Sequence, residues 1–232
     1  MITIATFAED LVVCDNREMN AINYLDLIRD ASVYDVAIKS PLELAHILSK
    51  RTNNRILMKR EDLQPVFSFK LRGAYNKIAS LSDNELANGV ICSSAGNHAQ
   101  GVALAAKKRG VRAVVVMPVT TPSIKVDAVR ALGGEVILSG DAYDDAYAYA
   151  KQLETEQTLI FIHPFDDPAV IAGQGTIGAE ILQQTDGEID AVFVPIGGGG
   201  LIAGIATCIK LQYPNIKIIG VEPDDSAAMR DS

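Results

Sequence analysis

The chain has 232 residues, of which 48% are hydrophobic and 22% are charged, and its formal net charge is −8. This composition is typical of a globular protein that can bury a sizeable core in one or two domains. Lys and Arg form no extended basic run, so we expect no nucleic acid among its partners, because phosphate backbones are bound by clustered cations. A small anionic ligand held by local donors is not excluded.

The cysteines and histidines predict neither a disulfide framework nor a metal site. The cysteines are Cys14, Cys92 and Cys208, and the histidines are His46, His98 and His163. An odd number of widely spaced cysteines favours a reduced, cytoplasmic setting. The histidines lack the spacing of metal ligands, so we expect no protein-bound metal. Acidic residues near the N-terminus argue against a secretory signal.

Residues 191–209 carry no charge and are numerous enough to cross a bilayer. They contain Pro195 and four consecutive glycines, which would break a membrane helix in its middle. We therefore interpret this stretch as a buried strand, a turn and a buried helix, and we expect no membrane association.

The first forty residues are predicted to be peripheral, and the elements up to residue 59 are short. Apolar residues at helical spacing predict a short helix over 20–31. Ser40 and Pro41, followed by Leu42 and Glu43, resemble a helix start with Ser40 as N-cap and Pro41 at the first helical position. Residues 55–59 predict a strand.

From residue 74 onward, short β-branched runs alternate with helical patterns. We expect strands at 90–93, 113–117, 135–138, 159–162, 191–196 and 217–221, and helices at 75–81, 97–109, 122–132, 143–155, 169–184 and 201–211. This alternation predicts an α/β fold with open parallel sheets, helices on both faces, and enough units for two domains. Residues 224–232 resemble the start of another helix, so we expect a fragment of a longer protein.

Lys70 is the first candidate for chemistry. It lies among Val66, Phe67, Phe69 and Leu71, just before a predicted helix. Apolar surroundings disfavour the ammonium form, and a neutral amine can attack a carbonyl to form a Schiff base. The alternative is a surface lysine whose stem lies on a half-buried strand.

Four glycines, Gly197 to Gly200, follow an apolar strand and precede Leu201, which opens an apolar helix. Backbone N–H groups that are not shielded by Cβ atoms can surround a phosphate, and the helix N-terminus favours an anion. The alternative is a strained turn. No Gly-Lys-Ser/Thr ending follows, so a nucleoside-triphosphate loop is not predicted.

Gly173, Gly175 and Gly178 match the dinucleotide pattern G-x-G-x-x-G. The residues before them predict a helix rather than the strand that this pattern requires. We interpret these glycines as allowing close helix packing, and a nicotinamide-dependent dehydrogenase is the rival hypothesis.

Ser94, Ala95, Gly96 and Asn97 lie between a predicted strand and a predicted helix. Their backbone N–H groups suit a carboxylate, and Asn97 adds a side-chain donor. Simple capping by Ser94 or Asn97 is the alternative, and the following His98 favours a structural role. An amine nucleophile, a phosphate cradle and a carboxylate cradle together suit pyridoxal phosphate holding an amino acid.

Several motifs resemble those of the fold type II pyridoxal-phosphate enzymes, and among them the biosynthetic threonine deaminases. The matching stretches are Lys-Arg-Glu-Asp at 59–62, Ser-Phe-Lys-Leu-Arg-Gly-Ala at 68–74, Ser-Ala-Gly-Asn-His-Ala-Gln-Gly at 94–101, Ile-Lys-Val-Asp-Ala-Val-Arg at 124–130, His-Pro-Phe-Asp at 163–166, Val-Ile-Ala-Gly-Gln-Gly-Thr at 170–176, and the tetraglycine loop. The resemblance runs from about residue 34 to the last residue and covers the N-terminal part of a catalytic region.

The resemblance implies two open parallel-sheet domains of the tryptophan synthase β type, with the larger one incomplete. Residues 1–79 and 164–232 would belong to the larger, cofactor-binding domain, and residues 80–163 to the smaller one. It also implies a homo-oligomer, a dimer or tetramer, in the full-length form.

The resemblance also assigns roles to residues. Lys70 would form the Schiff base with pyridoxal phosphate and serve as the catalytic base, while Phe69 would pack near the ring. Asn97 would bind the ring hydroxyl. The phosphate would bind to Gly197, Gly198, Gly199, Gly200 and Leu201, and the substrate carboxylate to Ser94, Ala95, Gly96 and Asn97.

The implied reaction is the dehydration and deamination of L-threonine, and possibly L-serine, to a 2-oxoacid and ammonia. From threonine the product is 2-oxobutanoate, at the first step of isoleucine biosynthesis. The related serine racemases carry serine at the position of Ala95, so alanine there favours one-sided elimination. The family's partner for the pyridine nitrogen lies beyond residue 232, so an inactive cofactor-binding fragment is one alternative, and a catabolic threonine or serine dehydratase is another.

Overall fold

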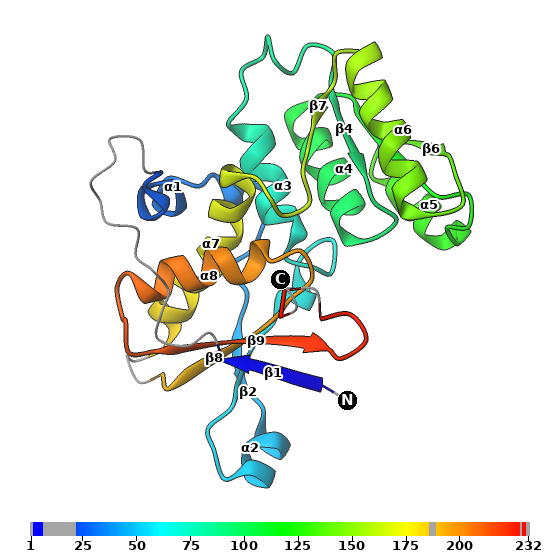
Figure 1. Cartoon of the computed structure of the whole chain (residues 1–232). Coiled ribbons are helices and arrows are strands. Elements are labelled where there is room, and N and C mark those ends of the chain that lie inside the picture. The colour runs from blue at the N-terminus through cyan, green and yellow to red at the C-terminus, as the bar shows by residue number, and fades with distance from the viewer. Residues whose placement is uncertain (1, 7–21, 186–188, 228, 231–232) are drawn as a thin grey trace. The chain divides into compact units, whose positions relative to one another are not determined.

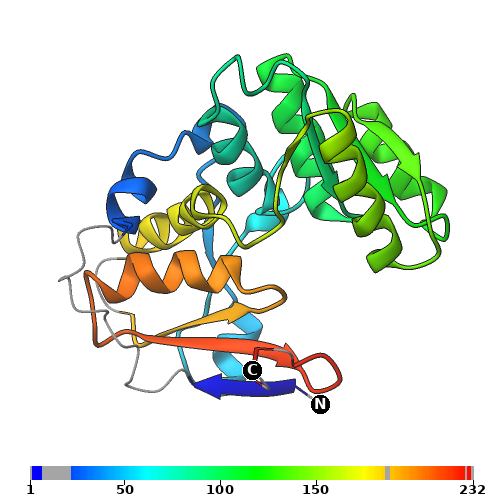
Figure 2. The ribbon, with the colours of Figure 1, turned by 45° about the horizontal axis from the view of Figure 1, so that its top comes forward.

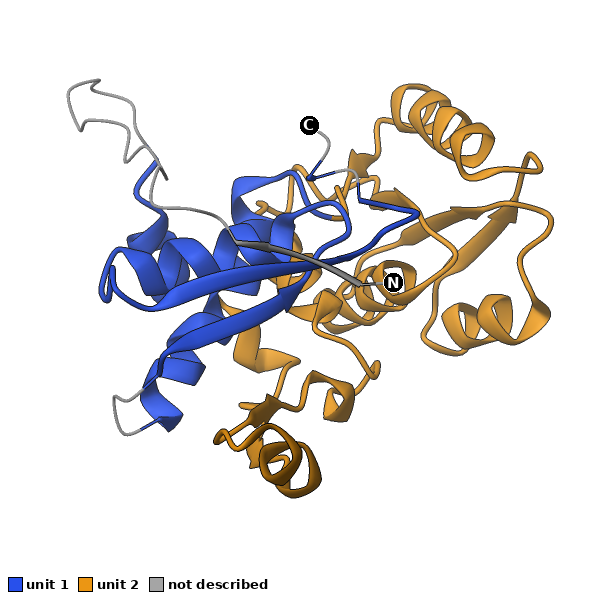
Figure 3. Ribbon diagram, turned by 60° about the horizontal axis from the view of Figure 1, so that its bottom comes forward, with its two compact units in different colours: residues 1–31, 165–232 blue, residues 32–164 orange. Residues whose placement is uncertain are grey.

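The computed structural model describes residues 2–6, 22–185, 189–227 and 229–230. Contacts between Cα atoms divide the chain into two compact units. Unit 1 comprises residues 1–31 and 165–232, and unit 2 comprises residues 32–164 (Figure 3). We describe each unit by itself.

Unit 2 is built on a four-stranded, all-parallel sheet with the order β6-β5-β4-β7 (Figure 1). The strands are β4 (Val90–Ser93), β5 (Ala113–Met117), β6 (Glu135–Leu138) and β7 (Ile160–Phe161), and the helices that alternate with them are α3 (Lys70–Ala79), α4 (Asn97–Arg109), α5 (Ser123–Ala131) and α6 (Tyr143–Glu156). The sequence-based prediction of a parallel α/β sheet is confirmed, and most boundaries agree within two residues. The exception is α3, which begins five residues before the predicted start.

The central strands of unit 2 are buried on both faces, and their alternate residues enter two separate cores. Val90 and Cys92 of β4 pack into the core shared with α3, α4 and α5. Ile91 between them packs into the core shared with α6. Because successive side chains of a strand point to opposite faces, a continuous apolar run is needed where both faces are covered.

A small antiparallel pair precedes the parallel sheet and overturns one expectation. β2 (Leu42–Leu44) pairs with β3 (Leu57–Lys59), and the helix α2 (His46–Thr52) lies between them. The predicted helix start at Ser40 was therefore wrong. Backbone pairing with β3 holds residues 42–44 extended, and Ala45 rather than Ser40 precedes the helix.

Unit 1 contains a three-stranded sheet with the order β1-β9-β8 (Figure 2). β8 (Ala191–Pro195) and β9 (Lys217–Pro223) are parallel, as predicted, whereas β1 (Ile2–Thr6) joins β9 antiparallel and was not predicted. α7 (Pro168–Gln184) packs against α8 (Gly200–Lys210), and α1 (Tyr24–Arg29) packs against both. The predicted helix over 20–31 is thus present from Tyr24, with residues 20–21 outside the described part.

The final predicted helix does not form in the part that the structure describes. Residues 224–227 and 229–230 are turns or irregular backbone, and residues 228 and 231–232 lie outside the described residues. Both oxygens of the buried Glu222 carboxylate accept backbone N–H bonds here, Oε1 from Met229 and Oε2 from Arg230, each at 3.1 Å. These bonds hold the chain in a turn that folds back towards β9.

Among the described residues, none of the helices is both long and apolar enough to cross a membrane. The stretch 191–209 forms β8, a glycine turn and most of α8, as the sequence predicted.

The observed units differ in one respect from the domain division that the resemblance implied. Residues 32–79 cluster with the four-stranded sheet of unit 2 rather than with residues 165–232. The division of the whole protein into a larger and a smaller domain therefore stays a prediction.

Candidate active site

Lys70 is the first residue of α3, and it is partly withdrawn from solvent. Nζ donates a hydrogen bond to the Pro164 carbonyl at 2.7 Å and lies 5.4 Å from the centroid of the Phe69 ring. Burial lowers the pKa of the Lys70 ammonium below its ordinary value of 10.5, because it takes the charged form out of water. The surroundings favour the neutral amine that nucleophilic chemistry requires.

The backbone just before Lys70 is strained at one position. Phe67 has a φ of 55°, a conformation that bulky residues rarely adopt, although its side chain is 76% exposed. Its N–H donates to the Gln64 carbonyl at 2.7 Å, which closes a tight turn. Ser68 follows, and its Oγ accepts from the backbone N–H of Lys70 at 3.2 Å. Strain of this kind persists where neighbouring contacts hold the segment in place.

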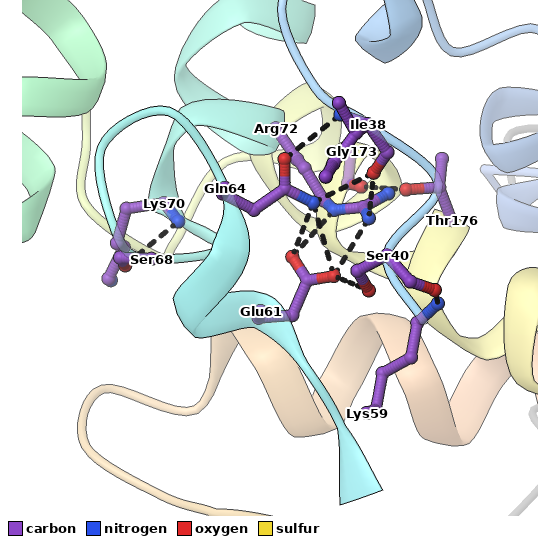
Figure 4. A network of polar contacts seen from close by, with 10 residues as sticks. All are labelled: Ile38, Ser40, Lys59, Glu61, Gln64, Ser68, Lys70, Arg72, Gly173 and Thr176. Atoms are coloured by element: carbon purple, nitrogen blue, oxygen red, sulfur yellow. Dashed lines mark hydrogen bonds and ion pairs between the residues drawn. The ribbon is translucent and has the colours of Figure 1, made fainter. Parts of the chain in front are cut away.

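A buried polar network lies on one side of this segment (Figure 4). The Arg72 guanidinium, which is fully buried, makes two hydrogen bonds of 2.8 Å to the Glu61 carboxylate. Ser40 Oγ donates to Glu61 Oε1 at 2.6 Å, and Gln64 Nε2 lies 3.3 Å from both Glu61 oxygens. The Gln64 amide also exchanges two bonds with the backbone of Ile38. Arg72 and Glu61 thus join residues that are far apart in sequence.

The loop before α4 carries the predicted carboxylate cradle. Gly96 occupies the N-cap position with no side-chain cap, so neither Ser94 nor Asn97 caps the helix, which was the simpler alternative. Ser94 Oγ instead accepts from the Gly96 N–H at 3.2 Å. The Asn97 side chain is exposed and makes no hydrogen bond to any residue that the structure describes. The first N–H groups of α4 and the Asn97 amide remain open to a ligand.

His98 is buried in the same helix and serves the structure of unit 2. Its Nε2 donates to the Ile162 carbonyl at 2.8 Å, two residues before Pro164. Burial lowers the pKa of the imidazole to about 3, and the nearby Lys70 and His163 act in the same direction. The ring is therefore neutral at physiological pH, which agrees with the structural role expected from the sequence.

The tetraglycine loop lies in unit 1, between β8 and α8. Gly199 has a φ of 87°, and a Cβ on Gly198 would lie 2.2 Å from Cδ1 of Phe165. A Cβ on Gly200 would lie 2.7 Å from the Phe165 carbonyl, whereas nothing lies within 4 Å of one on Gly197. Glycine is thus required by backbone conformation at one position and by Phe165 at two others.

The G-x-G-x-x-G segment lies inside α7 and packs against α8. A Cβ on Gly175 would lie 3.1 Å from the Gly204 carbonyl, and one on Gly178 would lie 3.0 Å from Cβ of Cys208. The prediction of close helix packing is confirmed at these two glycines. The dinucleotide interpretation requires a strand–turn–helix setting, which this helical segment does not have.

Of the predicted site residues, Lys70, Phe69 and residues 94–97 lie in unit 2, and residues 197–201 lie in unit 1. Sequence reasoning assigned no role to Glu61, Gln64 or Arg72. The available signal was an arginine two positions after Lys70, between apolar or small residues of the same helix. The Pro164 carbonyl was also missed, and a backbone acceptor leaves no signal in a sequence.

Comparison with known proteins gives the family. A family model described as "Pyridoxal-phosphate dependent enzyme" matches residues 33–232. The chain belongs to this family. Its cofactor is pyridoxal phosphate, which agrees with the cofactor predicted from the motifs, and the predicted fold type is confirmed.

Curated relatives within the family are similar along most of the chain. The chain is 62% identical to the chloroplastic biosynthetic threonine dehydratase of Arabidopsis thaliana, over 90% of this chain and 35% of the relative. It is 60% identical to the biosynthetic L-threonine dehydratase of Burkholderia multivorans, over 90% of this chain and 42% of the relative. The chain therefore spans well under half the length of these relatives.

Solved structures of the family are also similar. The processed form of threonine deaminase isoform 2 from Solanum lycopersicum matches with a TM-score of 0.82 and 59% identity, over 84% of this chain and 53% of that one. Maize serine racemase matches with a TM-score of 0.81 and 37% identity, over 84% of this chain and 59% of that one. The resemblance to threonine deaminases that the motifs indicated is thus confirmed over this part of the protein.

Proposed function

We propose that this chain is part of a pyridoxal-phosphate-dependent threonine ammonia-lyase, which converts L-threonine to 2-oxobutanoate and ammonia in isoleucine biosynthesis. The names of the relatives at 54–62% identity support the substrate and the pathway. The observation that carries the proposal is Lys70, a half-buried amine of lowered pKa at the start of a helix, in a chain of this family.

The residues of unit 2 fit the reactive part of the cofactor. Lys70 would hold it covalently through Nζ, which in the described part of the chain donates one hydrogen bond, to the Pro164 carbonyl. Phe69, whose ring lies beside Nζ, would pack near the pyridine ring. Asn97 would donate its amide, which has no partner among the described residues, to the ring hydroxyl. These groups provide an amine, an apolar surface and a hydrogen-bond donor.

The glycine loop of unit 1 fits the cofactor phosphate. Residues 197–201 place backbone N–H groups at the N-terminus of α8, where the helix dipole favours an anion. A side chain at position 198 or 200 would collide with Phe165, so glycine is needed at both. We assign the phosphate to this loop, with Gly197, Gly198, Gly199, Gly200 and Leu201 as its backbone donors.

The substrate would be held and deprotonated by a small number of groups. Backbone N–H groups of residues 94–97 would bind its carboxylate. Lys70 would take the proton from Cα, because a neutral amine is a competent base. Bound pyridoxal phosphate supplies the electron sink that makes loss of this proton feasible. Ala95 offers no acid or base to the other face of Cα, which favours elimination over racemisation.

The test is the substitution Lys70→Ala. We expect the purified protein to show the visible absorbance of a lysine-bound cofactor, borohydride to attach the cofactor permanently to Lys70, and L-threonine to yield 2-oxobutanoate. The variant should lose all three. Retention of the colour and of product formation would refute the assignment, and NADH binding in a titration would instead favour the dehydrogenase hypothesis.

Two related candidates remain to be separated. Because the chain spans 35–42% of its first two relatives, a protein with their full length is the proper comparison for turnover. A chain that binds the cofactor without turnover would be a cofactor-binding fragment. Equal kcat/KM for L-serine and L-threonine would favour a catabolic dehydratase.

We further propose a homo-oligomer, dimer or tetramer, for the full-length protein, in the cytoplasm or in a plastid. The free, buried cysteines Cys92 and Cys208 support a reducing compartment. The Arabidopsis relative is described as chloroplastic. Light scattering of the full-length protein and cell fractionation test these two points.

A further inference from the structure

The segment that leads to Lys70 is enclosed by one buried ion pair. Glu61 begins the 3-10 turn η2 (Glu61–Leu63), and Arg72 lies in the first turn of α3. The residues between them include Phe67, with its left-handed backbone, and Lys70. The two hydrogen bonds between Glu61 and Arg72 therefore close a loop that contains both the strained residue and the amine.

The pair is tied to the preceding chain as well. Arg72 Nη2 donates to the Ile38 carbonyl at 3.1 Å, and Gln64 Nε2 donates to the same oxygen at 2.8 Å. Ser40 Oγ donates to Glu61, and the Ser40 carbonyl accepts from Lys59 Nζ at 2.7 Å. We call Ser40, Glu61, Gln64 and Arg72 the Glu61 network. Every contact described here lies within unit 2.

The ion pair at the centre of the Glu61 network is largely buried. The side chain of Arg72 is 0% exposed and that of Glu61 is 14% exposed, so neither charge is well solvated. A buried ion pair is costly unless its geometry is good and its remaining polar atoms are satisfied. The two directional hydrogen bonds of the pair fix α3 relative to η2 at both ends of the strained segment, which apolar side chains in their place would not do.

We propose that the Glu61–Arg72 pair is a positioning device for Lys70, which fixes the strained segment 64–69 and so holds the amine in its partly buried position. The proposal rests on the proposed role of Lys70. Lys70 and Arg72 are two residues apart, roughly 200° around the helix axis, so Arg72 faces away from the Lys70 side chain. The pair acts through the backbone and touches neither the amine nor a reacting atom.

No other described group of unit 2 near Lys70 accounts for the position of its amine. The imidazole of His98 is neutral, and the nearby His163 helps to lower its pKa. Pro164 contributes a carbonyl that accepts the Lys70 hydrogen bond. Loosening the segment would let water reach Nζ, and the pKa of Lys70 would then rise towards the ordinary lysine value.

The test measures Lys70 itself and needs no cofactor. Competitive acetylation across pH, read by mass spectrometry, gives the midpoint at which the Lys70 amine becomes reactive. In the double variant Glu61→Met/Arg72→Met we expect this midpoint to rise by about one pH unit. At a fixed pH below the midpoint, the reactive, deprotonated fraction of Lys70 would then be roughly tenfold lower. The matched control is Arg112→Met/Glu135→Met, which removes an exposed pair of unit 2 with a contact of 2.8 Å and should leave the midpoint unchanged.

Folding is followed in the same samples by circular dichroism and thermal melting. If the double variant does not fold, the same midpoint is measured in Arg72→Lys, which keeps the charge but loses the two-point contact with Glu61. An unchanged midpoint in either folded variant would overturn the proposal and leave the pair a purely stabilising role. A shifted midpoint, together with a full-length protein that forms no lysine-bound pyridoxal phosphate, would support the positioning role and refute the proposed function instead.

Discussion

The position of Lys70 depends on how closely α4 approaches the first turn of α3. Gly101 makes this approach possible, since a Cβ there would lie 3.0 Å from the Leu71 nitrogen and 3.1 Å from the Lys70 carbonyl carbon. These neighbours are backbone atoms, which cannot rotate away as a side-chain tip can. The space beside Lys70 is therefore set by the absence of a side chain on the next helix.

We expect Gly101→Ala to push the first turn of α3 away from α4. Overpacking of this kind costs about 1–3 kcal/mol, partly offset by the better helix propensity of alanine. Urea unfolding measures the loss, and the affinity for pyridoxal phosphate should fall with it. Lys108→Ala, on the exposed face of the same helix, is the control. An alanine variant with wild-type stability and cofactor affinity would contradict the predicted clash.

His98 gives a prediction about acid stability. Its pKa is about 3 in the folded chain against an ordinary value of 6.5, so between these values the unfolded chain binds a proton that the folded chain does not. Stability is therefore full above pH 6.5 and falls as pH decreases towards 3, by up to about 1.4 kcal/mol per unit.

The substitution His98→Gln isolates this effect. Glutamine keeps a donor for the Ile162 carbonyl but does not titrate. We expect the free energy of unfolding, from urea titrations at pH 7, 5 and 4, to fall less steeply in the variant. Parallel pH profiles for the two proteins would show that His98 does not cause the acid sensitivity.

At the scale of elements, the contact between α7 and α8 depends on glycines from both helices. A Cβ on Gly204 would lie 2.5 Å from the Ile171 carbonyl and 2.6 Å from the Gly175 nitrogen. Helices approach this closely only where neither carries a side chain at the crossing. Since α8 also opens from the glycine loop, this packing sets where that loop begins.

Gly204→Ala should separate α7 from α8. We expect the free energy of unfolding to fall by about 1–3 kcal/mol, because backbone atoms of α7 must move. The affinity for pyridoxal phosphate should fall more than the affinity for pyridoxal, which lacks the phosphate. Ala206→Ser, at a half-exposed position of the same helix, is the matched control. Equal losses for the two ligands would show that the glycine loop is not coupled to this crossing.

At the scale of the whole molecule, the chain spans a minority of the length of its curated relatives. We expect a protein of their length to bind pyridoxal phosphate more tightly than this chain does, because the resemblance places a partner for the pyridine nitrogen after residue 232. Titrations of both proteins, followed by absorbance, test this. Equal affinities would mean that residues 1–232 contain all the groups that matter for binding.

Much of the fold was predictable because its determinants are local. The short, continuous apolar runs of β4 and β5 and the helical period of α4 and α6 are properties of short windows, so their boundaries followed from the pattern. The sequence also singled out Lys70, Asn97 and the glycine loop, since each joins a characteristic residue type to the start of a helix. The family match supports these motifs, while the individual roles stay proposals.

The sequence by itself determined the α/β class, most element boundaries, the cofactor and the residues that we propose to hold it. Only the tertiary structure decided that residues 42–44 form a strand, because their partner β3 lies across α2 in the chain. It also decided that Arg72 pairs with Glu61 and that Lys70 donates to Pro164, which lies 94 residues away. These are pairings between distant segments, and a local pattern contains no record of which segments meet.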